Sequence, residues 1–528
     1  MTDSASEYVL DAPYTWQFFG YQSPLVLNYI ARLNGVPTLP LDRPFTYCDL
    51  GCGNGVNCNV LAECFPNGEF YGVDFNPEHI ANANGLMAQG GCTNVTFLEN
   101  SFEELLESFL PKFDFIALHG IISWISEGVC EDLYRVVDRF LKPTGLLYVN
   151  YNALPGWEPL LPLVAKIKEL AADIEGDSIA KMRGVLGPLA TLEFNDAPPF
   201  KDNPAAKYKL STMLKDDPNY LVHEYLNSVV RPLKFDTVAD DMAAMGLVFC
   251  GSAEPADNHI DLSVPAEFRD QFPADEEDRP RESRKSQLLK AGFRRDLYCR
   301  AEHRGRGAQS FDDWVFFDTG QWEQEGRGEP TNEDEILGAV IRAGADGSRN
   351  IAELCEALKG YPKDTVVDVI HRLFAEKYLN VAAQKVLPVP TLADSTLPGQ
   401  GLRFTAPLNL AIMQKLFLAD GHCDLASRIA GNGRRLQGMQ ALILVAVHDV
   451  GFDAAPALVR QLIDHFKITW HVKGKAVTDP VEREKLLTQT FEAFLSGDLV
   501  KWTREGVIEA LPPGAPMPAE NRISPMLA

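Results

Sequence analysis

The fold is decided by Tyr47-Cys48-Asp49-Leu50-Gly51-Cys52-Gly53-Asn54-Gly55, where an apolar stretch meets an acidic residue and three alternate glycines. Glycine lets the backbone turn sharply and approach a ligand closely, and a helix opening near Val56 would direct its free amide groups at a negative group. A second strand, Glu69-Phe70-Tyr71-Gly72-Val73-Asp74, follows about 20 residues later and ends in a carboxylate that can accept hydrogen bonds from both ribose hydroxyls. Together the two segments predict a βαβ unit that binds an adenosine-bearing cofactor.

The spacing of the glycines favours a cofactor without a pyrophosphate. A dinucleotide-binding turn has the pattern Gly-x-Gly-x-x-Gly, whose third glycine lets helix and strand pack closely beside the pyrophosphate. This chain has Val56 at that third position. The pattern Asp-x-Gly-x-Gly-x-Gly, which begins at Asp49, resembles instead the first motif of class I S-adenosylmethionine-dependent methyltransferases. S-Adenosyl-L-methionine is therefore preferred over a nicotinamide, over a flavin and over an empty structural turn.

Three more strands are expected at residues 95–98, 113–119 and 145–151, alternating with helices. Alternation of this kind predicts an α/β fold with a parallel, doubly wound, Rossmann-like sheet. In such sheets ligands bind beyond the carboxyl ends of the strands. The polar residues gathered along that rim would be Asp49, Asp74, Ser101, His119 and Tyr151.

A narrower resemblance comes from three later segments: Asn150-Tyr151-Asn152-Ala153-Leu154-Pro155-Gly156-Trp157, residues 220–227 and residues 249–254. They resemble bacterial methyltransferases that carry a methyltransferase regulatory domain, a group that includes the rickettsial protein lysine methyltransferases of outer-membrane proteins. The resemblance covers about residues 8–301. It implies a homodimer with a broad cleft for a protein substrate. The substrate would have accessible lysines and could be an outer-membrane protein.

The resemblance also implies a set of cofactor-binding residues. In the methyltransferase family the third strand end holds the adenine, but this chain has Asn100 and Ser101 where an aspartate is common. His119 closes the fourth strand, where it either borders the cofactor or is a packed, hydrogen-bonded histidine. The expected cofactor residues are Tyr21, Asp49, Gly51, Gly53, Asn54, Asp74, Phe75, Asn100, Ser101, Phe102 and His119.

Methyl transfer to an amine requires an in-line approach and exclusion of water. A lysine side chain has a reference pKa near 10.4, so its neutral form at pH 7 lies about 4.6 kcal/mol above the charged form. An aromatic channel would reduce this difference by desolvation. We expect Tyr151, Tyr14 and Trp124 to act at the reacting atoms and Trp16, Asn152, Trp157 and His223 to bind the substrate.

Simpler interpretations exist for several of these residues. An aromatic residue that follows a strand, such as Trp124 or Trp157, often belongs to the core. His223-Glu224 begins like a zinc-protease helix, but Asn227 stands where the second histidine ligand would be, so no metal site is expected.

Composition is that of a large intracellular protein. The 528 residues exceed the ~250–300 that one core usually supports. We expect a cytoplasmic location without membrane insertion, because neither a signal peptide nor an apolar run of ~18 residues is present. A net charge of −24 argues against a nucleic-acid substrate. The ten cysteines contain no Cys-x-x-Cys pair, so free thiols are expected.

Composition also suggests the domain boundaries. An aromatic-rich cap at residues 1–44 would cover the rim, followed by the cofactor domain at residues 45–157. An α+β middle domain (158–329), a winged-helix-like module (330–387) and a helical C-terminal domain (388–528) would follow, with a linker at residues 388–401. The predicted function is protein lysine methylation. The alternatives are methylation of a small molecule and a cofactor-binding regulator or scaffold without turnover.

Overall fold

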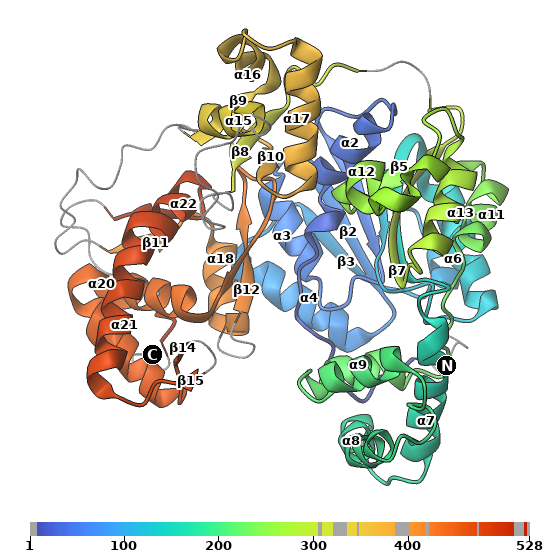
Figure 1. Ribbon diagram of the computed structural model, residues 1–528, viewed down its shortest axis with the longest axis horizontal. Helices are drawn as coiled ribbons and strands as arrows, with labels where there is room; N and C mark the ends of the chain where they lie inside the picture. The colour runs from blue at the N-terminus through green and yellow to red at the C-terminus, as the bar shows by residue number, and fades with distance from the viewer. Residues whose placement is uncertain are drawn as a thin grey trace.

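The computed structural model describes residues 8–304, 309–319, 335–345, 348–385, 401–417, 422–472, 475–511 and 522–524. At its centre is a seven-stranded sheet in the order β3-β2-β1-β4-β5-β7-β6 (Figure 1). The first five strands are parallel, which confirms the doubly wound α/β fold. They are β1 (Phe45–Leu50), β2 (Gly68–Asp74), β3 (Val95–Glu99), β4 (Phe113–Leu118) and β5 (Leu141–Asn152).

The central strands are apolar on both faces because helices cover both sides of the sheet. All six residues of β4 are buried, as expected for a parallel strand between two layers. Each crossover begins with a cap: Asn76 accepts from the amide of Glu78 at the start of one helix, and Ser101 accepts from Glu104 at the start of the next. The crossover helices are α3 (Val56–Cys64), α4 (Pro77–Gly90), α5 (Phe102–Leu106) and α6 (Glu127–Phe140).

Two strands from the segment assigned to the middle domain complete the central sheet. β7 (Phe293–Arg300) pairs antiparallel with β5, from Leu146 opposite Cys299 to Asn152 opposite Phe293, and β6 (Leu247–Ser252) pairs with β7. β7 thus lies between β5 and β6 in the sheet. Its hydrophobic pattern did not reveal its partner, because a strand's pattern shows which face is buried and not which edge it joins.

The rest of the described residues between 158 and 319 are mainly helical. Four helices, α7 (Leu161–Ala172), α8 (Ser178–Phe194), α9 (Pro204–Met213) and α10 (Pro218–Tyr225), share one apolar core and extend from the carboxyl end of the sheet (Figure 1). Helices α11 (Phe235–Ala244), α12 (Ile260–Ser263) and α13 (Asp278–Leu288) flank β6 and β7.

The winged-helix-like pattern corresponds to three helices and a small antiparallel sheet. The helices are α15 (Glu335–Ala345), α16 (Ile351–Ala357) and α17 (Lys363–Ala375). The sheet has the order β10 (Leu379–Ala382), β8 (Val315–Asp318) and β9 (Arg349–Asn350). The linker expected after this module lies, at residues 388–400, outside the described residues.

The C-terminal region packs against the cofactor domain through α18 (Pro407–Ile412) and the hairpin β12 (His422–Ser427) and β13 (Asn432–Gln437), which contact α4 and α3 (Figure 1). The longest helix, α20 (Gly438–His465), is kinked at Gly451. Its length and composition would allow it to cross a membrane, but 72% of its most apolar window is buried inside the protein. The region's other elements are α21 (Pro480–Ala493), α22 (Leu499–Arg504), the strand pair β11 (Leu402–Phe404) and β16 (Ile508–Ala510), and β14 (His471–Val472) with β15 (Lys475–Ala476).

Candidate active site

The loop after β1 adopts a backbone that only glycine accommodates without strain. Gly51, Gly53 and Gly55 have φ of +79°, +52° and +69°. A Cβ atom on Gly51 would overlap the side chain of Ile121, and one on Gly53 would lie 3.1 Å from the ring of Tyr14. The glycines therefore keep a cradle open above the end of β1, as the sequence predicted.

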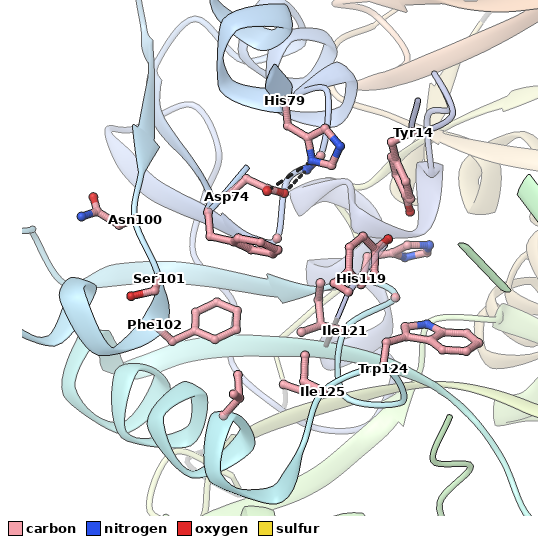
Figure 2. A pocket seen from close by; sticks show the side chains of 16 residues that line it. Tyr14, Asp74, His79, Asn100, Ser101, Phe102, His119, Ile121, Trp124 and Ile125 are labelled. Atoms are coloured by element: carbon pink, nitrogen blue, oxygen red, sulfur yellow. Dashed lines mark hydrogen bonds and ion pairs between the residues drawn. The ribbon is translucent and has the colours of Figure 1, made fainter. Parts of the chain in front are cut away.

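Asp74, at the end of β2, ties three parts of this cradle together. Its Oδ2 accepts from the amide of Gly53 at 2.9 Å, and its Oδ1 accepts from the amide of Asn76 at 2.9 Å. Nδ1 of His79 lies 3.2 Å from the same Oδ1 (Figure 2). His79 was not predicted, although the Asn76-Pro77 helix start places it in the first turn of α4, where it contacts Asp74.

A pocket, called here the rim pocket, opens between the glycine loop and the following strand ends. Its walls are mostly apolar, and Asp74 with His79 lies across from Ile121 and Ile125 (Figure 2). Most of the predicted cofactor residues line it, together with unpredicted Tyr8 and Val129. The lining residues are Tyr8, Tyr14, Gly51, Gly53, Asp74, Phe75, His79, Asn100, Ser101, Phe102, His119, Gly120, Ile121, Trp124, Ile125 and Val129.

Ser101 lines this pocket, but its polar groups serve the helix. Its hydroxyl oxygen accepts from the amide of Glu104 at 3.2 Å, and its own amide donates to Oε2 of Glu104 at 2.8 Å. This capping box engages both the hydroxyl and the amide of Ser101. The ring of Phe102 and the first-turn backbone of α5 border the pocket instead.

His119 is held as a neutral imidazole. Its Nδ1 lies 3.1 Å from the hydroxyl of Tyr148 and 3.0 Å from Nδ2 of Asn150, and the ring of Phe19 stacks on it at 3.9 Å. Burial, reinforced by the charge of Arg295, lowers its pKa to about 3. His119 is thus a packed, hydrogen-bonded histidine that also lines the rim pocket, and an uncharged ring would not repel a cationic cofactor there.

A second pocket, called here the adjoining pocket, shares a wall with the rim pocket. Both are lined by Tyr8, Tyr14, His119, Gly120 and Trp124. The predicted substrate residues Asn152, Trp157 and His223 all line the second pocket. Its remaining lining residues are Thr15, Gln17, Phe19, Ser123, Asn150, Tyr151, Leu160, Lys209, Tyr220, Glu224 and Phe293.

The N-terminal segment separates the two pockets and is fixed from both sides. The carbonyl of Tyr14 accepts from Nδ2 of Asn54 at 3.0 Å, and Nε2 of His223 lies 3.2 Å from the carbonyl of Ala12. Asn54 therefore positions Tyr14 and is not among the residues that line the rim pocket. Burial, followed by the charges of Asp74, Glu224 and Asp49, raises the pKa of Tyr14 to about 12, so its hydroxyl keeps its proton at neutral pH.

Asp49 lies beneath the glycine loop. It is 3% exposed and does not line the rim pocket. Burial, followed by the charge of Asp74, raises its pKa to about 7. Asp49 would therefore influence a bound cofactor indirectly, by supporting the glycine loop and through the charge of its carboxylate.

Tyr151 corrects a prediction. Its hydroxyl was expected to face the nucleophile, but it donates to Oδ2 of Asp296 at 2.6 Å. Asp296 also accepts from Nε of Arg294, whose guanidinium pairs with Glu282. This buried network links β5 to β7, so the hydroxyl of Tyr151 connects the strands of the sheet.

Tyr21 and Trp16 also lie elsewhere than predicted. The hydroxyl of Tyr21 donates to Glu254 at 3.0 Å, and Nζ of Lys415 lies 4.2 Å from the ring of Trp16. Neither residue lines the rim or the adjoining pocket. The chain leaves the rim after Phe19, whose amide and carbonyl both bond to the side chain of Asn57 in α3.

The residues at the rim fit an adenosyl cofactor without a pyrophosphate. The glycine cradle admits a ligand beside the backbone, Asp74 lies where ribose hydroxyls would bind, and Phe75 and Phe102 offer flat apolar walls. Val56 is buried at the start of α3, where a dinucleotide fold needs glycine. Within the described ranges no group of metal-ligating side chains is found, and all ten cysteines are free thiols.

Comparisons with known proteins agree with this geometry. Residues 41–196 match the family model described as "Methyltransferase domain", and residues 217–300 match "Predicted methyltransferase regulatory domain". Uncharacterized protein sll1526 of Synechocystis sp. is 28% identical over 95% of this chain and 99% of its own length. Uncharacterized protein RP789 of Rickettsia prowazekii is 29% identical over 41% of this chain and 39% of its own length.

A solved structure shares the overall fold of this chain. PKMT2 from Rickettsia typhi in complex with AdoHcy superposes with a TM-score of 0.68 at 21% identity, covering 94% of this chain and 100% of that one. At this identity the likeness establishes the fold.

Proposed function

Because this chain is an S-adenosylmethionine-dependent methyltransferase with a methyltransferase regulatory domain, we propose that it methylates lysine side chains of a protein. The fold likeness to PKMT2, a protein lysine methyltransferase, supports this acceptor class. So does the acidic character of the chain, with a net charge of −24 that suits a basic target. We also propose that the working form is a cytoplasmic homodimer that acts on a protein with accessible lysines, such as an outer-membrane protein.

One observation carries the proposal: the adjoining pocket meets the rim pocket through an aromatic wall. Trp124 and Trp157 pack edge to face at 6.4 Å, and Tyr14 and Tyr220 line the same pocket. Aromatic faces suit both the aliphatic stem of a lysine and its charged end. A side chain that enters this pocket would direct its nitrogen at the shared wall, where the methyl group would be presented.

The bound cofactor supplies a methyl group on a positively charged sulfur. The residues of this chain align the acceptor and exclude water. Tyr14 and Trp124 border both pockets, so they would enclose the path between the nitrogen and the methyl carbon. His119, which is neutral, adds no positive charge of its own at the shared wall.

The test is to incubate the purified full-length chain with methyl-labelled S-adenosylmethionine and fractionated bacterial cell protein. Acid hydrolysis of the labelled bands is expected to release methylated lysine. Label found only in small molecules would favour a metabolite methyltransferase. Tightly bound cofactor without any transfer would favour a regulator or scaffold, and either result would overturn the proposal.

A further inference from the structure

Glu224 is an acidic residue that borders the adjoining pocket and has no structural partner there. It is the penultimate residue of α10 and is partly buried. Among the described residues, no side chain forms an ion pair with its carboxylate within 4.0 Å. Burying a charge without a partner is costly, so an unpaired carboxylate in a pocket indicates a cationic ligand.

Other polar atoms around the pocket also lack partners. Nε2 of His223 faces the carbonyls of Ala12 and Pro13, which leaves Nδ1 as a buried acceptor without a hydrogen bond in the described structure. Nδ2 of Asn152 is likewise buried and unsatisfied within the described residues. Buried polar groups are normally paired. His223 and Asn152 both line the adjoining pocket, so two of its walls carry polar side chains with unused hydrogen-bonding groups.

The electrostatics of the pocket favour a positive ligand. The C-terminal end of α10 adds a partial negative charge beside Glu224. The nearest opposing charge is Lys209, whose Nζ lies over the ring of Tyr225 at 5.6 Å from its centroid. The titratable groups around Glu224 are Lys209 from α9, Tyr220, His223 and Tyr225 from α10, Tyr8 and Tyr14 from the N-terminal segment, and His119 after β4.

We propose, resting on the lysine-methylating function above, that Glu224 receives the ammonium group of the substrate lysine, takes one proton from it and delivers the neutral amine to the methyl donor. Tyr14 connects the two ends of this path, because the charges of both Asp74 and Glu224 act on it. Tyr14 lines both pockets, and Glu224 lines the adjoining one.

The step balances in atoms and charge. The lysine ammonium passes a proton to the carboxylate of Glu224 and becomes a neutral amine. The nitrogen lone pair then forms a bond to the methyl carbon while the carbon–sulfur bond breaks and leaves its electron pair on sulfur. The products are a methylammonium ion and a neutral thioether, and the carboxylic acid of Glu224 returns its proton to solvent.

The acidity of Glu224 suits such a cycle. Burial raises its pKa to about 7, although the charge of Lys209 acts in the opposite direction. A group with a pKa near the working pH can both accept and release a proton, and such groups typically contribute ~10²–10⁴-fold to a rate.

The experiment compares the wild type with Glu224→Gln, which keeps the shape but cannot take a proton. The substrate is the cell-protein fraction that the wild type labels, and methyl-lysine formation is followed from pH 6 to pH 10. Asp216→Asn is the matched control, because it removes one negative charge near α10 but does not line the pocket. Binding of S-adenosylhomocysteine by calorimetry checks the cofactor site.

We expect Glu224→Gln to lower kcat/KM at pH 7 by ~10²–10⁴-fold, with unchanged S-adenosylhomocysteine affinity. In the wild type and in Asp216→Asn, kcat/KM should rise through about pH 7 as Glu224 loses its proton. In Glu224→Gln this rise should vanish, and the rate should climb towards pH 10 as the lysine itself loses its proton. Partial recovery in Glu224→Asp would add support and provides a second variant if the first folds poorly.

The outcomes separate the two proposals. A variant that keeps the wild-type rate or the wild-type pH profile would overturn the role of Glu224 and leave lysine methylation standing. A wild type that transfers label but yields no methyl-lysine would overturn the lysine specificity, and the role of Glu224 with it.

Discussion

Asp74 shows how one carboxylate organises the cofactor site. It holds the amides of Gly53 and Asn76 and the ring of His79, and it still borders the rim pocket. The sequence predicted its position at the end of a strand. It did not predict that the same carboxylate also fixes the glycine loop.

Asp74→Ala is expected to weaken binding of S-adenosylhomocysteine by about 10- to 100-fold, because a hydrogen bond to a charged group contributes ~1.5–3 kcal/mol. Titration calorimetry measures this change. Glu69→Ala removes an exposed carboxylate from the same strand and serves as the control. Unchanged affinity in Asp74→Ala would show that the ribose is not held here.

Asp49 gives a prediction about pH. Its pKa is about 7 in the folded protein, against an ordinary value of 3.8, so between those values the folded state holds a proton that the unfolded state has lost. The native state therefore loses stability as the pH rises from about 4 to 7, and the loss is complete above pH 7.

Asp49→Asn removes this penalty, since an amide does not ionise. At pH 8 and without cofactor the variant should be more stable than the wild type by roughly 1–4 kcal/mol, at ~1.36 kcal/mol for each pKa unit. The gain should disappear near pH 4. Melting temperatures of both proteins at several pH values test this, and a gain that is equal at all pH values would contradict it.

At the scale of single elements, the β1–α3 loop determines whether the pocket can open. Gly51 combines a positive φ with contact to Ile121, whereas Gly35 has a positive φ of +76° and no atom within 4 Å of the position that a Cβ would occupy. Alanine substitutions at Gly35 and at Gly51 therefore separate the free-energy cost of backbone strain from the cost of a steric clash.

Gly35→Ala should lower stability by about 1–2 kcal/mol and leave cofactor affinity unchanged. Gly51→Ala should lower stability by a further ~1–3 kcal/mol through overpacking, and it should impair binding of S-adenosylhomocysteine. Thermal melting and calorimetry on both variants provide the measurement. Equal effects of the two substitutions would mean that the space above Gly51 is not needed.

Contacts between elements also explain why some predicted site residues lie away from the expected positions. Tyr151 lies in the register expected of a strand end, but its hydroxyl pairs with Asp296 because β7 inserts beside β5. The aromatic cap reaches the rim at Tyr14, yet the ring of Trp16 contacts Lys415 instead, and Tyr21 lies beyond Phe19, where Asn57 anchors the chain. In each case a contact distant in sequence decided the orientation.

At the scale of the whole molecule, the C-terminal region stabilises the cofactor domain. Leu408 in α18 is fully buried and packs directly on Gly90 of α4. Ser23 donates to the carbonyl of Gly431 at 2.6 Å, and Arg428 pairs with Glu63 at 2.8 Å. Helix α4 also carries His79, so this interface supports the cofactor site from behind.

Leu408→Ala should reduce stability by ~2–5 kcal/mol, because it leaves a cavity in this interface. Val481→Ala, on a side chain that is 78% exposed in the same region, should have little effect. Melting temperature reports both changes. Below the melting temperature, S-adenosylhomocysteine affinity of the Leu408 variant should stay near the wild-type value, since no rim residue is altered.

The sequence by itself determined the sheet core, the glycine cradle and the acidic strand end, because these depend on local backbone conformation and on the order of strands and helices along the chain. Glycine spacing and the missing third glycine were enough to indicate an adenosyl cofactor without a pyrophosphate. Only the tertiary structure decided the joining of β6 and β7 to the sheet, the docking of the C-terminal region and the partners of Tyr151, Tyr21 and Trp16. It also brought Glu224 of α10 to the pocket that meets the cofactor site. These features rest on contacts between residues far apart in the chain, where burial and charge pairing are decided by packing and leave no periodic signal in the sequence.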